Sequence, residues 1–251
     1  MSIISFANRF AFIKTKKVAG TSVEALLRNF TGRDDIVPAV TPRDEHSMLL
    51  SGNFSKNYLR DKSQEQQYID LVMQGQYEDA TKFLSSQKKI AFSHMGYKKV
   101  VELIGKYGYN VSDFFIFTIE RHPYSWLLSN VTYDNFQYNS KGSVDVQSRV
   151  QRADEAVRTF MNRSDFEDLI NWGKYASGNE VLVDKVVDYN DLRKGIEESL
   201  NEIGVGFTDI ELPDLKKGSR DLNAWDILSA ESKVMAQNKF RDVFQLMRYM
   251  I

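Results

Sequence analysis

Three lysines stand close together near the start of the chain, and a glycine and two hydroxyl residues follow them. These residues are Lys14, Lys16 and Lys17, then Gly20, Thr21 and Ser22. Glycine lets the backbone approach a ligand closely, and the N–H groups at the start of a helix attract anions. Lys17 adds a mobile positive charge, and the two hydroxyls add donors. The pattern is typical of a phosphate-binding loop.

A second interpretation of this segment needs no ligand. Thr21 and Glu24 have the spacing of a capping box, in which the threonine caps the following helix, and the lysines are then a solvated charge run. The order Gly-x4-Gly-Lys-Ser/Thr of the Walker A loop is absent, because the lysine here precedes the glycine. A nucleotide kinase is therefore disfavoured.

The segment "TIERHPYSWLLSN" forms a second turn with unusual polar content. Arg121 directly follows an apolar run that predicts a buried strand, and Ser129 lies eight residues later, two turns into the next helix. An arginine at such a place forks onto a phosphate through two N–H groups. The alternative is an arginine at a strand end that pairs with a neighbouring acid.

Together the two turns resemble the sulfotransferase superfamily, in the branch that contains the bacterial and Golgi carbohydrate enzymes (family 2). The loops of that branch have the patterns Pro-Lys-Thr-Ala-Gly-Thr-Ser and Arg-x-Pro-x-x-Arg-x-x-Ser. Here they are "KKVAGTS", residues 16–22, and "RHPYSWLLS", residues 121–129. Lys16 replaces the proline, Val18 replaces a threonine, and Trp126 replaces the second basic residue.

This resemblance implies a donor, 3'-phosphoadenosine-5'-phosphosulfate (PAPS), whose product is adenosine 3',5'-bisphosphate. By analogy with the family, the first loop holds the 5'-phosphosulfate, and Arg121 with Ser129 holds the 3'-phosphate. The implied donor-binding residues of the first loop are Lys17, Ala19, Gly20, Thr21 and Ser22. Three residues of "LPDLKKGSR" are expected to close over the nucleotide: Lys217, Ser219 and Arg220.

Two residues are the candidates for catalysis. A lysine ammonium beside the bridging oxygen of the leaving phosphate stabilises charge that grows in the transition state, and Lys17 matches the family's loop lysine. The acceptor hydroxyl needs a base with a pKa near neutrality, and His94 is expected at the same sheet edge as both loops. A capping or core role for His94 is the alternative. His46 in the acidic insertion could contact substrate, His122 is expected to orient its loop, and Glu120 is the alternative base. Lys14 and Lys16 are expected to raise the local positive potential.

Alternating strand and helix patterns must position these residues. Strands are expected at 6–15, 88–95, 113–120 and within 180–189, and helices after Gly20, from 96, from Pro123, at 190–204 and at 229–250. This alternation predicts an α/β fold with a P-loop-like, mostly parallel central sheet and helices on both faces. We expect one domain, 1–251, with a helical and loop insertion at about 31–87.

Composition narrows the remaining classes. The 251 residues carry a net charge of -1, with no cysteine and three histidines, so we expect no nucleic-acid partner and no metal. No apolar run of membrane length and no signal peptide is present, so we expect a cytoplasmic protein. The predicted function is a PAPS-dependent sulfotransferase acting on a hydroxyl of a sugar, glycolipid or small metabolite. The alternatives are an inactive nucleotide-binding module of the same fold and a P-loop kinase-type phosphotransferase.

Overall fold

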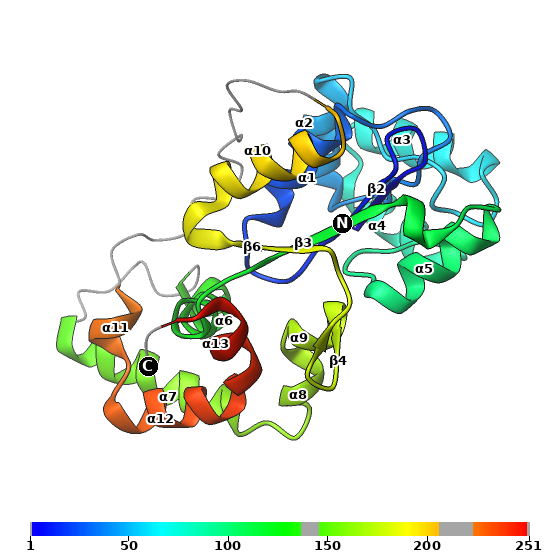
Figure 1. The fold of residues 1–251 in the computed structure, drawn as a ribbon. Helices are drawn as coiled ribbons and strands as arrows, with labels where there is room; N and C mark the ends of the chain where they lie inside the picture. The colour runs from blue at the N-terminus through cyan, green and yellow to red at the C-terminus, as the bar shows by residue number, and fades with distance from the viewer. Residues whose placement is uncertain (1, 137–145, 206–222, 250–251) are drawn as a thin grey trace.

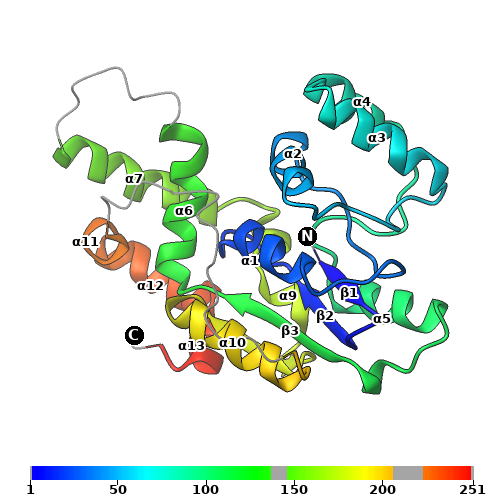
Figure 2. The ribbon, with the colours of Figure 1, turned by 90° about the horizontal axis from the view of Figure 1, so that it is seen from above.

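A four-stranded mixed sheet forms the centre of the protein. The computed structural model describes residues 2–136, 146–205 and 223–249. The strands are β1 (Ile3–Ser5), β2 (Phe10–Ile13), β3 (Phe115–Glu120) and β6 (Lys185–Asp188), and they lie in the order β1-β2-β3-β6 (Figures 1 and 2). β2, β3 and β6 run parallel, and β1 lies antiparallel at the edge. The predicted α/β fold is confirmed, with a mixed sheet. That the sheet is P-loop-like stays a prediction.

Helices cover both faces of this sheet (Figure 2). Phe10 and Phe12 of β2 lie in a core with α1 (Gly20–Arg28) and α10 (Leu192–Glu202). Ala11 and Ile13, which alternate with them, lie in a second core with α5 (Tyr97–Lys106). Because successive side chains of a strand point to opposite faces, this alternation places α1 and α10 on one face and α5 on the other.

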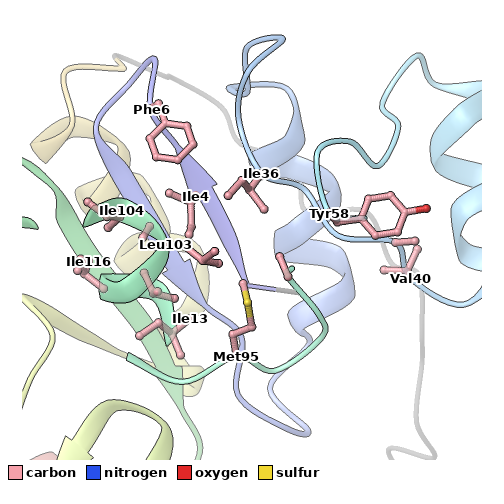
Figure 3. Packing of buried hydrophobic residues seen from close by; sticks show 14 of the residues in the cluster. Ile4, Phe6, Ile13, Ile36, Val40, Tyr58, Met95, Leu103, Ile104 and Ile116 are labelled. Atoms are coloured by element: carbon pink, nitrogen blue, oxygen red, sulfur yellow. The ribbon is translucent and has the colours of Figure 1, made fainter. Parts of the chain in front are cut away.

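The 31–87 segment packs onto the same core as α5. It contains α2 (Pro42–Leu50), α3 (Ser63–Met73) and α4 (Tyr77–Ser86). Isolated β-bridges join Ile4 to Ile36 and Val37 to Lys56. Val40 and Tyr58 of this segment belong to one buried cluster with Ile4, Ile104 and Ile116 (Figure 3). That residues 1–251 form one domain stays a prediction.

A third apolar cluster lies among helices beyond the carboxyl end of β3 (Figure 1). Its helices are α6 (Pro123–Phe136), α7 (Val146–Met161), α11 (Ala224–Ile227), α12 (Ala230–Lys239) and α13 (Arg241–Met247). Pro123 begins α6 as predicted. The expected single helix at 229–250 is instead two helices that meet at Phe240, a buried residue whose backbone leaves the helical region.

Three of the expected strands need correction. The strand expected at 6–15 is shorter and consists of β2 alone. The residues between β1 and β2 form a turn that contains Arg9, which has a left-handed backbone. Residues 88–95 form no strand, because Ile90 and Ala91 donate to the carbonyl of Tyr58 and one bridge joins Leu59 to Lys89. The strand expected within 180–189 is divided. Its start, β5 (Glu180–Val181), pairs with β4 (Ala176–Ser177), and its end is β6.

Short elements complete the described chain: the helices α8 (Phe166–Leu169) and α9 (Trp172–Tyr175), and single turns at Val111–Asp113 and Tyr189–Asp191. No helix within residues 2–136, 146–205 and 223–249 is both long and apolar enough to cross a membrane.

Candidate functional site

The two loops that carry the motifs, residues 16–22 and 121–129, lie side by side at one edge of the sheet. The first follows β2 and the second follows β3, and these strands are parallel neighbours. The carboxyl ends of parallel strands meet at a common edge, where open α/β sheets bind ligands. The guanidinium of Arg121 donates from Nη1 to the backbone carbonyl of Lys17 at 3.1 Å. Arg121 and Lys17, predicted separately from two motifs, are thus in direct contact.

The first loop turns sharply into α1. Lys17 and Ala19 both have left-handed backbones, with φ of 61° and 54°. This conformation costs a residue with a Cβ roughly 1–2 kcal/mol, so surrounding contacts must hold the loop. The first N–H groups of α1 have no carbonyl partner within the helix and favour an anion. Ala19 is exposed, Lys17 and Thr21 are half-buried, and Ser22 is buried.

Thr21 does not cap α1, so the capping-box interpretation is wrong. α1 begins at Gly20, and its N-cap is Ala19, which makes no side-chain hydrogen bond. Thr21 lies inside the first turn, where its Oγ1 is 3.4 Å from Nζ of Lys14. Glu24 does not reach back to the cap but pairs with Lys14.

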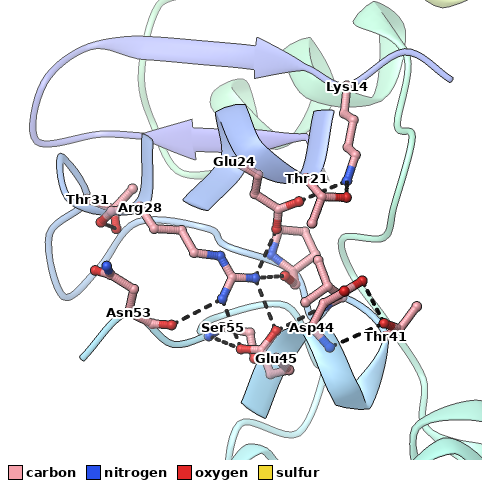
Figure 4. Close-up of polar contacts among 12 residues, drawn as sticks. Lys14, Thr21, Glu24, Arg28, Thr31, Thr41, Asp44, Glu45, Asn53 and Ser55 are labelled. Atoms are coloured by element: carbon pink, nitrogen blue, oxygen red, sulfur yellow. Dashed lines mark hydrogen bonds and ion pairs between the residues drawn. The ribbon is translucent and has the colours of Figure 1, made fainter. Parts of the chain in front are cut away.

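Lys14 is a buried ion-pair partner and not part of an open positive field, which corrects the sequence-based expectation. Its Nζ lies 3.1 Å from Oε2 of Glu24 (Figure 4). Burial alone would raise the pKa of Glu24, but neighbouring cations, Lys14 and Arg28 among them, lower it to about 2. A Cβ on Gly20 would lie 2.7 Å from Cε of Lys14. Gly20 therefore makes room for Lys14.

Side chains from two other elements hold the backbone of Lys16. The indole N–H of Trp126 donates to the Lys16 carbonyl at 3.0 Å. Asn171 accepts from the Lys16 N–H at 2.8 Å and donates to the Lys16 carbonyl at 3.1 Å. Burial, and then repulsion by Lys174, lower the pKa of the Lys16 ammonium. Trp126 thus holds the backbone of the first loop.

Glu120, the last residue of β3, is buried, so its carboxyl group is not open to an acceptor hydroxyl. It is 3% exposed. Its Oε1 accepts from the Arg121 N–H at 2.9 Å, and its Oε2 accepts from the Tyr175 hydroxyl at 2.8 Å. Burial raises the pKa of Glu120 to about 7, although these hydrogen bonds act to lower it. The carboxyl group joins the second loop to α9.

Arg121 has unused hydrogen-bonding capacity. Its guanidinium carbon lies 4.6 Å from the centre of the Tyr189 ring, and its buried Nε has no hydrogen-bond partner among the residues that the structure describes. Burial lowers the pKa of Arg121. A buried guanidinium N–H without an acceptor is costly, and an anion would satisfy it. Ser129 lies half-buried in α6.

His94 contacts the first loop even though it ends no strand. Its backbone is left-handed, with φ of 58°, and its Nδ1 lies 3.0 Å from the carbonyl of Lys14. A carbonyl only accepts, so Nδ1 carries the hydrogen and Nε2 keeps a lone pair. Burial, and the charge of Lys14 with it, lower the pKa of His94 to about 4. The imidazole is half-buried and neutral at pH 7.

The other two histidines have structural partners. Nδ1 of His122 accepts from the N–H of Tyr124 at 3.3 Å, and its carbonyl accepts from the N–H of Trp126. His122 therefore caps α6, in keeping with the orienting role expected for it. Its ring packs against Trp225 and Tyr249, and burial lowers its pKa to about 4. His46 lies in α2 and bonds to the hydroxyl of Tyr77 in α4.

Some expected features fall outside the described residues or away from the loops. Lys217, Ser219 and Arg220 lie outside the described residues. Within the described ranges, no group of three or more His, Asp or Glu side chains is arranged to hold a metal ion. Two surface cavities, of about 490 and 640 Å³, are lined by residues of the 31–87 segment and by the end of α1. Neither is lined by Lys17, His94 or Arg121.

One solved structure aligns with nearly the whole chain, at low similarity. No family model matches the chain, and no curated protein matches it. The solved structure of a sulfotransferase from Alicyclobacillus acidocaldarius aligns with 97% of this chain and 96% of its own, at 13% sequence identity and a TM-score of 0.36. With a TM-score this low, the assignment of the fold rests on the sheet topology given above.

Sequence reasoning missed three parts of the site: Asn171, Tyr175 and the structural role of Trp126. Asn171 lies within the apolar run "LINWGKY" and is only 2% exposed. A polar side chain that is buried among apolar neighbours needs hydrogen-bond partners, and this requirement was the available signal. The identity of the partner, 155 residues earlier in the chain, comes only from the fold.

Proposed function

We propose that this protein is a sulfotransferase that moves a sulfuryl group from PAPS to a hydroxyl of a small-molecule or saccharide acceptor. The observation that carries the proposal is the contact between Arg121 and the Lys17 carbonyl. It brings the two motifs that resemble the sulfotransferase loops together at the carboxyl edge of neighbouring parallel strands. Two phosphate-type loops at one edge suit a donor that carries phosphate groups at two positions.

The residues present fit such a donor. Within the described part of the chain, the buried Nε of Arg121 lacks an acceptor, which a 3'-phosphate oxygen would supply, and Ser129 follows on α6. The start of α1, with Ala19, Gly20, Thr21 and Ser22, suits the 5'-phosphosulfate. Lys217, Ser219 and Arg220 are proposed by resemblance alone. When bound, the donor supplies the sulfuryl group and the leaving phosphate.

Lys17 is the proposed electrophilic residue. It lies in the strained turn directly before α1, and the Arg121 contact fixes its carbonyl. An ammonium held at the bridging oxygen stabilises the charge that develops there more strongly in the transition state than in the ground state. Because Lys14 is neutralised by Glu24, the proposal assigns this role to Lys17 and not to Lys14.

His94 is the proposed general base. Its Nδ1 is bound to the Lys14 carbonyl, so Nε2 is the nitrogen that accepts the hydroxyl proton. A pKa of about 4 keeps the ring in the neutral form that a base needs, but it also makes the base weak. A bound anionic donor raises that pKa, because a nearby negative charge favours the protonated imidazole.

The alternative is a nucleotide-binding protein without transfer activity. The low pKa of His94 and the use of Trp126 as a structural donor favour it. Turnover separates the two functions, because both bind adenosine 3',5'-bisphosphate and only the enzyme forms a sulfated product. A cytoplasmic location and the nature of the acceptor stay predictions.

The test uses thermal shift with adenosine 3',5'-bisphosphate, followed by incubation of labelled PAPS with mixed hydroxyl acceptors. We expect a rise in the melting temperature, a labelled product, and a loss of about a hundredfold in kcat for Lys17→Ala. Lys106→Ala is the control. Lys106 is exposed at the end of α5, which leads to the amino-terminal end of β3, whereas both loops follow the carboxyl ends of their strands. No shift with the bisphosphate contradicts the proposal, and binding without product supports the inactive alternative.

A further inference from the structure

The peptide groups of the first loop are held by side chains from well outside it. The Lys16 carbonyl accepts two hydrogen bonds, from Trp126 of α6 and from Asn171, which directly precedes α9. Asn171 also accepts from the Lys16 N–H. Asn171 thus holds both polar groups of one residue with one amide, at 2.8 and 3.1 Å.

Asn171 is itself fixed in one orientation. Its Oδ1 faces the Lys16 N–H, so its Nδ2 must face the two acceptors, the Lys16 carbonyl and Oε1 of Glu120 at 3.4 Å. Glu120 also accepts from the N–H of Arg121 and from the hydroxyl of Tyr175. Asn171 and Glu120 therefore connect the loop of Lys17 to the loop of Arg121 beneath the surface.

The backbone of the first loop is strained, and the hydrogen bonds of Asn171 help to hold it in that conformation. Lys17 and Ala19 occupy the left-handed region, which residues with a Cβ keep only where neighbouring contacts enforce it. Asn171 acts on the residue directly before Lys17. Loss of its hydrogen bonds would leave the Lys16 N–H without this partner and would let the strained turn relax.

We infer that Asn171 is a positioning residue, which holds the first loop in the conformation that receives the 5'-phosphosulfate end of the donor. The inference rests on the proposed function, because that function assigns the 5' end to this loop and the 3'-phosphate to Arg121. Its two shorter hydrogen bonds, at 2.8 and 3.1 Å, go to Lys16, and its contact with Glu120 is longer, at 3.4 Å. Its loss is therefore expected to weaken chiefly the ligands that reach the first loop.

The experiment compares two probes on each variant by calorimetry or ligand-observed NMR. Adenosine 3',5'-bisphosphate reaches both loops, and adenosine 3'-monophosphate lacks the group for the first loop. For Asn171→Ala we expect about tenfold weaker binding of the bisphosphate, equal to about 1.4 kcal/mol, and unchanged binding of the monophosphate. Asn171→Asp retains the acceptor for the Lys16 N–H but loses the donor, and we expect it to weaken the bisphosphate alone as well.

Asn57 provides the matched control. It is also buried and donates to two backbone carbonyls, those of Arg33 and Asp35, but it lies in the 31–87 segment. Asn57→Gly removes the amide without strain, because its φ of 55° suits glycine. We expect it to lower the melting temperature and to leave both affinities unchanged.

The outcomes separate the inference from the proposed function. If the wild-type protein binds neither probe, the proposed function fails. If it binds the bisphosphate and the Asn171 variants bind it equally well, or lose affinity equally for both probes, the positioning role alone is overturned. Failure of both variants to fold also overturns it, since Asn171 would then serve the fold as a whole.

Discussion

At the scale of single residues, the missing side chain of Gly20 leaves the space that the buried side chain of Lys14 occupies. The Lys14 side chain crosses the α-carbon of Gly20 to reach Glu24, and both Lys14 and Glu24 are buried. A glycine at the start of α1 suggests close approach by a ligand, but here the approaching group is a side chain of the protein. The side chain of Lys14 is thereby fixed below the loop that carries Lys17.

This contact predicts the effect of adding one methyl group. In Gly20→Ala the Cβ would lie 2.7 Å from Cε and 2.9 Å from Cγ of Lys14, so the buried lysine must move. We expect the free energy of unfolding to fall by about 1–3 kcal/mol in urea denaturation. Gly105→Ala in α5 is the control, because nothing lies within 4 Å of its added Cβ. We expect it to stabilise the protein by up to about 1 kcal/mol. Equal effects at the two positions would contradict the packing argument.

At the scale of elements, α1 carries a chain of buried charges along one side. Glu24 pairs with both Lys14 and Arg28, and Arg28 pairs with Glu45 of α2 (Figure 4). Glu45 also accepts from the N–H groups of Val40 and Ser55. The chain of ion pairs therefore extends from the start of α1 into the 31–87 segment.

A substitution at the far end of this chain of charges is expected to be costly. Glu45→Gln preserves size but places an NH₂ group among donors and leaves the Arg28 charge with one partner fewer. Breaking a buried pair costs about 3 kcal/mol or more, so we expect a loss of that order in urea denaturation. The control is Glu198→Gln, because Glu198 pairs with Lys185 but is half exposed, and we expect little change. A small effect at Glu45 would show that solvent screens the chain of charges.

The elements differ in how far the sequence predicted them. β3 and the start of α6 were predicted, because a fully buried strand has a continuous apolar run and Pro123 marks a helix start. Residues 88–95 also contain apolar side chains, but their backbone bonds to Tyr58 and not to the sheet. A pattern of side chains indicates burial without identifying the partner. For the same reason the lysines were found, while the pairing of Lys14 with Glu24 was not.

At the scale of the whole molecule, the candidate site lies where three apolar clusters meet. Val18 of the first loop belongs to the cluster of α1 and α10, and Trp126 belongs to the cluster of α6 and α12. Tyr175, which bonds Glu120, belongs to the cluster of α5. Polar groups at such a junction are desolvated from several sides, which is the first cause of the altered pKa values of His94, Glu120 and His122.

Glu120 and the two histidines, His94 and His122, change the free energy of unfolding with pH in opposite directions. The pKa of Glu120 rises from 4.5 to about 7 on folding, so its contribution is fully present below pH 4.5 and is lost as the pH rises to about 7. The pKa values of His94 and His122 fall from 6.5 to about 4. The folded protein then holds fewer protons at these residues than the unfolded chain, so stability rises from pH 4 to 6.5. The two histidines thus oppose Glu120 over much of the same range.

Substitution separates the pH dependence of stability that comes from Glu120 from the one that comes from the histidines. Glu120→Gln removes the carboxyl titration, so its free energy of unfolding relative to the wild type should rise between pH 4.5 and 7, by up to about 3 kcal/mol. Above pH 7 the difference should stay level. His122→Asn keeps an acceptor for the Tyr124 N–H and should show the reverse trend between pH 4 and 6.5. Urea denaturation across this range gives both differences. Parallel curves for Glu120→Gln and the wild type would mean that the carboxyl is ionised when buried, held by Tyr175, Asn171 and the Arg121 N–H despite the cost of desolvation.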